Sequence, residues 1–371
     1  MLTLGIETSC DDTGLALVES GQVLAQVLAS QEDLHAVFGG VVPEIASREH
    51  LRVLPKLFKL VLKRAGCGLK DIELIAVTRG PGLLASLLMG ISFAKGLCVG
   101  GDKDLIGVDH LQAHLAVANL ENSIEFPALG LVLSGGHTNL YRLNSLFELE
   151  LLGRTLDDAI GEAFDKVAKL VNLPYPGGKF IDLLAREGEV DPGLLPKPYI
   201  DNTNLDFSFS GIKTAVLNLV RKHPDLVLSK VKNKRDDQLK ELACVELKNL
   251  CASFCYTLTE TLKIKIRRAW KKNKDIQSLV LAGGVASNSF IRNGIGKLAK
   301  ELGLRMIVPK PELCTDNGVM IAYLGEKLRA KGWQHTLSLD AIPRGRSVPW
   351  DFISKKGSKS YLDMQERRKV D

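Results

Sequence analysis

The sequence predicts an α/β protein made of two lobes of related topology around a central cleft. Two patterns each occur twice along its 371 residues. A strand, a short turn and a return strand are expected over residues 2–18 and again over 127–143. A strand, a Gly-rich turn and a helix are expected over residues 74–97 and again over 277–302. Because both halves repeat one succession, we expect a duplicated fold whose loops face the cleft.

The first half begins with a strand, and its elements can be placed from hydrophobic periodicity and from the residues that start helices or form turns. Pro43 suits the first turn of a helix, and Glu44 suits the positive end of its dipole. We expect strands at residues 2–6, 14–18, 22–29, 74–78 and 105–108, and helices at 43–64 and 83–97.

The second half has strands and helices of its own. We expect strands at residues 127–133, 139–143 and 277–281, and helices at 166–171, 179–186, from about 288 to 302, and 319–330. The first lobe should comprise residues 1–108 with about 317–345, and the second lobe 109–316. Residues 346–371 should form a flexible basic tail.

Composition indicates an ordinary globular protein. Hydrophobic residues make up 45% and charged residues 25%, and the length suits two domains. The net charge of +6 permits a nucleic-acid partner without requiring one. Seven scattered cysteines without a CxxC pair favour reduced thiols and a cytoplasmic protein. Neither a signal peptide nor an apolar run of membrane-spanning length is expected.

A pair of histidines follows the strand at residues 105–108. His110 and His114 lie four residues apart, so a helix would present both imidazoles on one face. Two such side chains and a third ligand can bind a metal ion and leave positions open for substrate. For an isolated pair of this spacing, packed or solvated histidines at a helix start are the more common case. A zinc protease is excluded, because Leu111 stands where its catalytic Glu is required.

The loop after the first strand is dense in acids and hydroxyls. It contains Glu7, Asp11 and Asp12 with Ser9 and Thr13. Its amides and hydroxyls can meet a phosphate, and its carboxylates can hold a hydrated cation. A polar hairpin turn accounts for the composition equally well.

Gly-rich turns follow two of the predicted strands. Residues 134–138 read SGGHT and residues 283–288 read GGVASN. Bare backbone amides in such turns can approach the phosphates of a nucleotide.

Other polar stretches leave alternatives open. Residues 204–214 can grip a phosphate or an RNA backbone, or simply join a strand to a helix. Basic residues cluster at 221–240 and 263–274, where solvated faces are expected. Thr315 or Asp316 can cap the helix at 319–330, and Asp316 can alternatively act as a carboxylate ligand.

Taken together, these motifs resemble the bacterial tRNA N6-adenosine threonylcarbamoyltransferase family, formerly described as O-sialoglycoprotein endopeptidases. The motifs occur in the family's order from about residue 2 to 340, and the ordered set is far more specific than any single motif. They are residues 5–11 (GIETSCD), 39–48 (GGVVPEIASR), 80–82 (GPG), 110–114 (HLQAH), 134–138 (SGGHT), 161–166 (GEAFDK), 175–178 (YPGG), 207–214 (FSFSGIKT), 283–288 (GGVASN) and 314–317 (CTDN).

The resemblance implies the actin/sugar-kinase/Hsp70-like ATPase fold and a set of site residues. It implies one divalent metal ion, Fe²⁺ with Zn²⁺ or Mg²⁺ as alternatives, held by His110, His114 and Asp316. It also implies an adenylate site for threonylcarbamoyl-AMP. The residues of that site are Leu133, Ser134, Gly135, Gly136, His137, Asp165, Gly178, Asp182 and Asn288.

The implied reaction transfers threonylcarbamoyl to N6 of the adenosine at position 37 of tRNAs that read codons beginning with adenine, and it releases AMP. Asp11 is the candidate general base, and His137 can donate a hydrogen bond to the phosphate. The implied partners are tRNA, a paralogous inactive subunit of the same fold (TsaB-like), a small P-loop ATPase (TsaE-like) and a separate synthase that supplies threonylcarbamoyl-AMP.

Two features limit the resemblance. The family commonly has Glu at the position of Asp12. The charged stretch near 230–240 and the C-terminal tail have no counterpart in the family pattern, so the resemblance implies no function for them. A kinase of the same fold fits the loops but leaves the histidine pair unexplained. A non-catalytic ATP-binding scaffold is the other rival.

Overall fold

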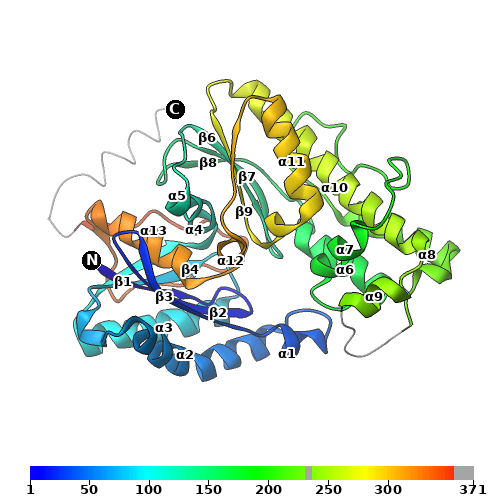
Figure 1. Ribbon diagram of the computed structural model, residues 1–371. Helices are drawn as coiled ribbons and strands as arrows, with labels where there is room; N and C mark the ends of the chain where they lie inside the picture. Colours follow the sequence, from blue (N-terminus) through cyan, green and yellow to red (C-terminus); the bar gives the residue numbers. More distant parts are fainter. Residues whose placement is uncertain (230–235, 355–371) are drawn as a thin grey trace. The chain divides into compact units, whose positions relative to one another are not determined.

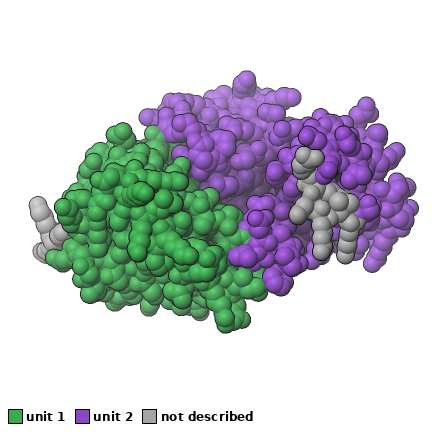
Figure 2. All heavy atoms as spheres, turned by 60° about the horizontal axis from the view of Figure 1, so that its bottom comes forward, with its two compact units in different colours: residues 1–31, 41–120, 316–371 green, residues 32–40, 121–315 purple. Residues whose placement is uncertain are grey.

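The computed structural model describes residues 1–229 and 236–354. The chain forms two compact units, coloured separately in Figure 2. Unit 1 consists of Met1–Gln31, Val41–Leu120 and Asp316–Asp371, and unit 2 of Glu32–Gly40 and Glu121–Thr315. The division therefore falls after Leu120 rather than at residue 108, because helix α4 (His110–Ala116) packs against helix α13 (Gly318–Ala330) of unit 1.

Unit 1 contains a five-stranded mixed sheet in the order β3-β2-β1-β4-β5. Strands β1 to β4 of this sheet are labelled in Figure 1. The first three strands form an antiparallel meander, and β4 and β5 run parallel to β1. The strands are β1 (Leu2–Glu7), β2 (Asp12–Glu19), β3 (Gln22–Ser30), β4 (Leu74–Gly80) and β5 (Asp104–Asp109).

Unit 2 repeats this topology. Its sheet has the order β10-β9-β6-β7-β8, so β6 to β10 take the places of β1 to β5 with the same strand directions. The strands are β6 (Ala128–Leu133), β7 (Thr138–Leu143), β8 (Leu149–Arg154), β9 (Ser278–Ala282) and β10 (Arg305–Ile307). The predicted duplication is confirmed. The sequence did not predict β8, an edge strand with one buried residue.

Two long helices cover one face of the unit 1 sheet. Helix α2 (Pro43–Ala65) ends at Gly66 in the left-handed conformation, and α3 (Leu84–Gly101) packs against α2 and β4. Leu4 and Ile6 meet Leu54 and Ile91 in this core. Contrary to expectation, α3 is long and apolar enough to pass a membrane-span test by length and composition. That test is weak support for a span, because core helices of soluble proteins also pass it.

Helix α13 lies on the opposite face, and glycines set its distance. A Cβ at Gly5 would lie 2.1 Å from the Gly318 carbonyl oxygen, and one at Gly325 would lie 2.5 Å from the Ala76 Cβ. Only small residues on both elements permit this approach. The tight packing fixes the backbone just before α13, where Asp316 lies.

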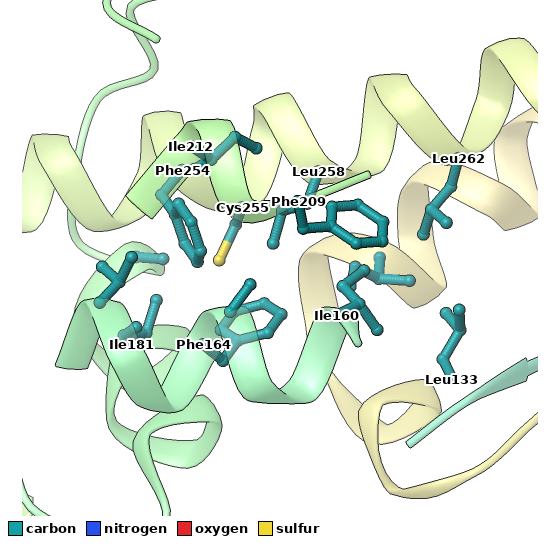
Figure 3. Packing of buried hydrophobic residues seen from close by; sticks show 14 of the residues in the cluster. Leu133, Ile160, Phe164, Ile181, Phe209, Ile212, Phe254, Cys255, Leu258 and Leu262 are labelled. Carbon is teal, nitrogen blue, oxygen red and sulfur yellow. The ribbon is translucent and has the colours of Figure 1, made fainter. Parts of the chain in front are cut away.

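The core of unit 2 forms between its sheet and several helices (Figure 3). Phe164 of α6 and Phe254 of α10 pack edge to face with ring centroids 5.2 Å apart, while Leu133 enters from the end of β6. The helices are α6 (Ile160–Leu170), α7 (Gly177–Ala185), α8 (Ser210–Lys222), α9 (Asp236–Leu242), α10 (Val245–Lys272), α11 (Ser289–Glu301) and α12 (Pro311–Cys314).

Helix α10 includes the basic cluster predicted as a solvated face. Lys271 and Lys272 are exposed, but Lys265 is completely buried and donates to the Asn202 side chain at 2.7 Å. Burial lowers the pKa of Lys265 to about 8. The basic composition of the cluster did not show that one lysine turns inward to hold the 199–204 loop.

The segment before the described C-terminus packs on unit 1. Strands β11 (Trp333–Gln334) and β12 (Ile353–Ser354) pair, and Trp333, Trp350 and Phe352 form an aromatic cluster. Asp351 forms an ion pair with the buried guanidinium of Arg79. Residues 346–354 were expected in a flexible tail. Three of them make specific contacts instead: Trp350 and Phe352 pack on Trp333, and the Asp351 carboxylate pairs with Arg79. Residues 355–371 of that tail, and residues 230–235 of the charged stretch, lie outside the described residues.

The remaining short elements connect these larger ones. They are α1 (Glu32–Ala36), α5 (Ala118–Glu121), and the 3₁₀ turns Leu69–Asp71, Pro224–Leu226 and Gly284–Ser287.

Candidate metal centre and adenylate turn

Helix α4 begins at His110 because Asp109 caps it. The Asp109 carboxylate accepts the backbone N–H groups of Leu111 and Gln112 at 2.8 and 2.9 Å. This cap starts the helix immediately after β5, so His110 and His114 lie one turn apart at its beginning. Their rings pack edge to face with centroids 4.6 Å apart, and both side chains are buried.

Asp316 completes a cluster with the two histidines inside unit 1. Its Oδ1 atom lies 3.0 Å from His114 Nε2 and 3.6 Å from His110 Nε2. The predicted cap of α13 by Thr315 or Asp316 is wrong. Asn317 is the cap, and its side-chain oxygen accepts the Met320 N–H at 2.9 Å. The carboxylate of Asp316 therefore turns toward the imidazoles instead of toward the helix.

Glu7 orients His110 from the other side. Its fully buried carboxylate contacts His110 Nδ1 at 3.1 Å and accepts hydrogen bonds from the Thr78 hydroxyl and the Ser9 N–H. Burial alone lowers the pKa of His110, but the carboxylates of Glu7 and Asp316 outweigh it and raise that pKa to about 9. One sign of this role was visible in the sequence, because Glu7 is an acid at the end of a strand that is otherwise mostly apolar.

The chemistry of this cluster suits a divalent metal ion. One ligand atom from each of His110, His114 and Asp316 lies within 4.8 Å of the other two. Two imidazoles and one carboxylate are a common ligand set for Fe²⁺ and also suit Zn²⁺. A metal-binding histidine usually has its second ring nitrogen held by a carboxylate, and Glu7 holds His110 in this way. All three residues belong to unit 1, so this unit by itself contains the three candidate ligands.

The acidic loop lies beside this cluster. Burial, together with the carboxylates of Asp316 and Asp11, raises the pKa of Asp12 to about 7. Asp11 belongs to the same group of acids, and its backbone carbonyl accepts the Gln31 N–H at 3.2 Å. The loop is thus electrostatically coupled to the cluster, as a purely solvated hairpin turn would not be.

The Gly-rich turn of unit 2 joins β6 to β7. The Ser134 N–H donates to the His137 carbonyl at 2.9 Å, and the His137 N–H donates to the Ser134 hydroxyl at 3.0 Å. A Cβ added at Gly135 would meet no atom within 4 Å. Behind the turn, Gly161 approaches Ser134 and Gly283 approaches Leu133 so closely that a Cβ would lie 2.7 and 2.3 Å from their carbonyl oxygens. Hydrogen bonds between Ser134 and His137 therefore hold the two ends of the turn together, and the space beside Gly135 is free.

The other predicted adenylate residues surround helices α7 and α11 of unit 2. Asp165 accepts the Gly177 N–H at 2.7 Å, next to Gly178, where a Cβ would have room. Asp182 accepts the Ser289 N–H at 2.9 Å, and Asn288 caps α11 by accepting the Ile291 N–H at 3.0 Å. Asp165, Asp182 and Asn288 therefore each make a structural hydrogen bond within unit 2.

The stretch at 204–214 forms a strand-to-helix join. Asp157 accepts the Phe209 N–H at 2.8 Å and the Ser210 hydroxyl at 2.8 Å, so its carboxylate occupies the beginning of α8. Of the alternatives left open for this stretch, the geometry favours the structural one.

Solved structures define the class of protein. HypF from T. kodakarensis has a TM-score of 0.55 at 14% identity, covering 89% of this chain and 47% of that one. Component A of the (R)-2-hydroxyglutaryl-CoA dehydratase of Acidaminococcus fermentans has a TM-score of 0.51 at 14% identity, covering 89% and 99%. Together with the duplicated sheets, these similarities define an actin/sugar-kinase/Hsp70-like ATPase fold.

Sequence comparison then identifies the family. The model of the TsaD family, tRNA N6-adenosine threonylcarbamoyltransferase, matches residues 22–323. Proteins of that name from Maridesulfovibrio salexigens and Trichlorobacter lovleyi are 54% and 45% identical, each over 95% of this chain and 99% and 100% of theirs. The chain belongs to the tRNA N6-adenosine threonylcarbamoyltransferase family. It is an acyltransferase that modifies adenosine in tRNA, as the motifs predicted.

Proposed function

We propose that this protein transfers the threonylcarbamoyl group of threonylcarbamoyl-AMP to N6 of adenosine 37 in tRNAs that read codons beginning with adenine. The new C–N bond forms as the bond between the carbamoyl carbon and the phosphate oxygen breaks. AMP leaves, and N6 loses a proton. Family membership and the convergence of His110, His114 and Asp316 on one point carry this proposal.

His110, His114 and Asp316 are the proposed metal ligands, and Fe²⁺ is the proposed ion. The ion would supply Lewis-acid polarisation of the acyl group and a template for the threonyl part. The protein's own contribution is orientation. Asp109 fixes the start of α4, Asn317 leaves the Asp316 carboxylate turned toward the histidines, and Glu7 keeps the His110 ring in place.

The turn at 134–137 is the proposed seat of the adenylate phosphate. The open space beside Gly135 allows a phosphate to approach the backbone, and His137 would donate a hydrogen bond to it. Leu133, Gly136, Asp165, Gly178, Asp182 and Asn288 are the proposed remainder of the adenylate site. These residues would hold the leaving group while the acyl carbon is attacked.

Asp11 is the proposed general base for the proton on N6. An exocyclic adenine amine is a poor nucleophile, so positioning should supply much of the rate acceleration. Asp11 suits the role because it is a carboxylate in the loop that follows β1, in the same unit as the proposed metal ligands.

Partner proteins are the last part of the proposal. The net charge is only +6, so the isolated chain should bind tRNA weakly, and the binding should fall steeply with salt. We infer that it acts in the cytoplasm with a TsaB-like paralogue, a TsaE-like ATPase and a synthase that supplies threonylcarbamoyl-AMP.

The test is a single-turnover reaction with metal-loaded protein, tRNA, threonylcarbamoyl-AMP and the partner proteins. Nucleoside mass spectrometry should detect threonylcarbamoyladenosine at position 37, and AMP should appear in equal amount. Elemental analysis of protein purified without chelators identifies the ion. Modified adenosine without AMP release, or full activity in protein that contains no metal, would contradict the proposal.

A further inference from the structure

His50 lies outside every motif assigned to the reaction, yet it contacts the acidic loop twice. It is located in the second turn of α2, and its side chain is completely buried. Its Nε2 atom lies 2.9 Å from the Cys10 carbonyl oxygen, and its Nδ1 atom lies 2.7 Å from the Thr13 hydroxyl. The two contacts fall on either side of Asp11 and Asp12, so one imidazole brackets both acids.

The partners determine the hydrogens of this imidazole. A carbonyl oxygen only accepts, so Nε2 must carry the hydrogen that is donated to Cys10. In a neutral ring Nδ1 then accepts from the Thr13 hydroxyl. Burial favours this neutral ring, because it lowers the pKa of His50 despite the nearby carboxylates. Both contacts are therefore satisfied by a single tautomer.

Other contacts hold the part of the loop that His50 does not reach. The Thr8 hydroxyl donates to the Ser86 carbonyl at 3.0 Å, and the Ser9 carbonyl accepts the Leu83 N–H at 2.8 Å. These contacts fix the side of the loop that adjoins His110. On the far side, the Asp11 carbonyl accepts the Gln31 N–H at 3.2 Å and Asp12 pairs with Ser30 of β3. His50 adds the side-chain contacts there, because it joins two points of the loop to one rigid ring on a long helix.

We propose that His50 is a positioning residue for acyl transfer, which acts by holding the Asp11 carboxylate in its reactive place. The inference rests on the general-base role proposed above for Asp11. Replacing the ring would allow the loop to shift without removing a metal ligand or an adenylate contact. A displacement of about 1 Å at a reacting group can lower a rate on the order of 100-fold.

The experiment compares single-turnover transfer rates of H50Q, T13V, T13S and D11N, together with the H50Q/D11N double variant. Metal-loaded full-length protein is used with its partners, and melting temperature, metal content and KM for tRNA are measured on the same preparations. H50Q should slow transfer about 10- to 100-fold, with metal content and KM near the wild-type values. T13V removes the hydroxyl and should slow transfer less, whereas T13S keeps the hydroxyl and should recover most of the rate.

The double variant separates positioning from a general structural effect. If His50 acts through Asp11, H50Q should slow the D11N protein little further, because residues that act as a unit are not additive. A full rate in folded H50Q, or an equal loss in the presence and absence of Asp11, would overturn the inference. If D11N transfers at the wild-type rate, the role proposed for Asp11 fails and the inference fails with it. If D11N is slow but H50Q transfers at the wild-type rate, the inference about His50 is wrong and the role proposed for Asp11 stands.

Discussion

The β1–β2 loop of unit 1 and the β6–β7 turn of unit 2 occupy the same place in two copies of one sheet topology. The first is acidic and is tied to the rest of unit 1 by side-chain hydrogen bonds, including those of Glu7 and His50. The second contains no acid, and close backbone packing at Gly161 and Gly283 supports it. Equivalent positions have thus acquired different chemistry, carboxylates beside imidazoles in one unit and open backbone in the other.

This difference shows how a duplicated fold can divide two tasks. Carboxylates and imidazoles attract a cation, whereas bare amides and small residues admit a phosphate. The topology supplies both positions, and the local sequence decides what each position can bind. If the two loops act independently, a change in one should leave ligand binding at the other intact.

The largest effect is expected from removing the histidine pair. His110→Ala with His114→Ala should abolish metal binding and slow transfer about 10²- to 10⁴-fold, since Lewis-acid stabilisation is worth several kcal/mol. Nucleotide binding should persist, because the turn at 134–137, the proposed seat of the adenylate phosphate, belongs to unit 2. Elemental analysis, transfer assays and calorimetry with AMP measure the three quantities. A folded double variant without metal that transfers at the wild-type rate would show that the pair is structural.

A bulky residue in the Gly-rich turn at 134–138 should impair AMP binding and leave metal binding intact. Gly135→Val should weaken AMP binding at least about tenfold, ~1.4 kcal/mol, because the side chain would fill the space proposed for phosphate. The fold should tolerate it, since a Cβ there meets no atom within 4 Å. Calorimetry and metal analysis on one preparation test both statements. Unchanged AMP affinity in a folded variant would remove the turn from the adenylate site.

The C-terminal segment of unit 1 should make stability depend on pH through His335. Burial, with the Arg79 charge, lowers the pKa of His335 to about 4. The unfolded chain takes up this proton near pH 6.5 and the folded chain does not, so stability should fall as pH decreases from about 6.5 to 4. The contribution is at most about 3 kcal/mol. Melting curves of the wild type and His335→Gln should converge toward pH 4, and parallel curves would contradict the prediction.

A smaller effect is expected at the start of α8 in unit 2. Asp157→Ala should destabilise the protein by about 1 kcal/mol, because this exposed carboxylate caps the helix. Hydrogen bonds to Ser208, Phe209 and Ser210 overcome partial burial and lower the pKa of Asp157. The difference from wild type should therefore be present at neutral pH and shrink as pH falls through the carboxylate range. Urea unfolding at several pH values measures it. Asp157→Asn, which keeps one acceptor oxygen, is the control.

Sequence pattern alone identified the duplication, most strands, several of the helices, the histidine pair and the Gly-rich turns, but not the long helix α10. These features depend on local periodicity, turn residues and short spacings, which are all written within a few neighbouring residues. The histidine spacing was informative because Asp109 directly precedes the pair and caps the helix that contains both histidines.

Tertiary structure decided which distant residues meet and which side chain takes which role. Asn317 rather than Asp316 caps α13, Glu7 supports His110, and Asp351 reaches the buried Arg79. His50 contacts a loop about 40 residues earlier in the chain, and Lys265 turns inward from a basic helix. No periodicity encodes these contacts. They follow from how helices pack on the sheets, where glycines allow elements to approach and where burial forces each polar atom to find a partner.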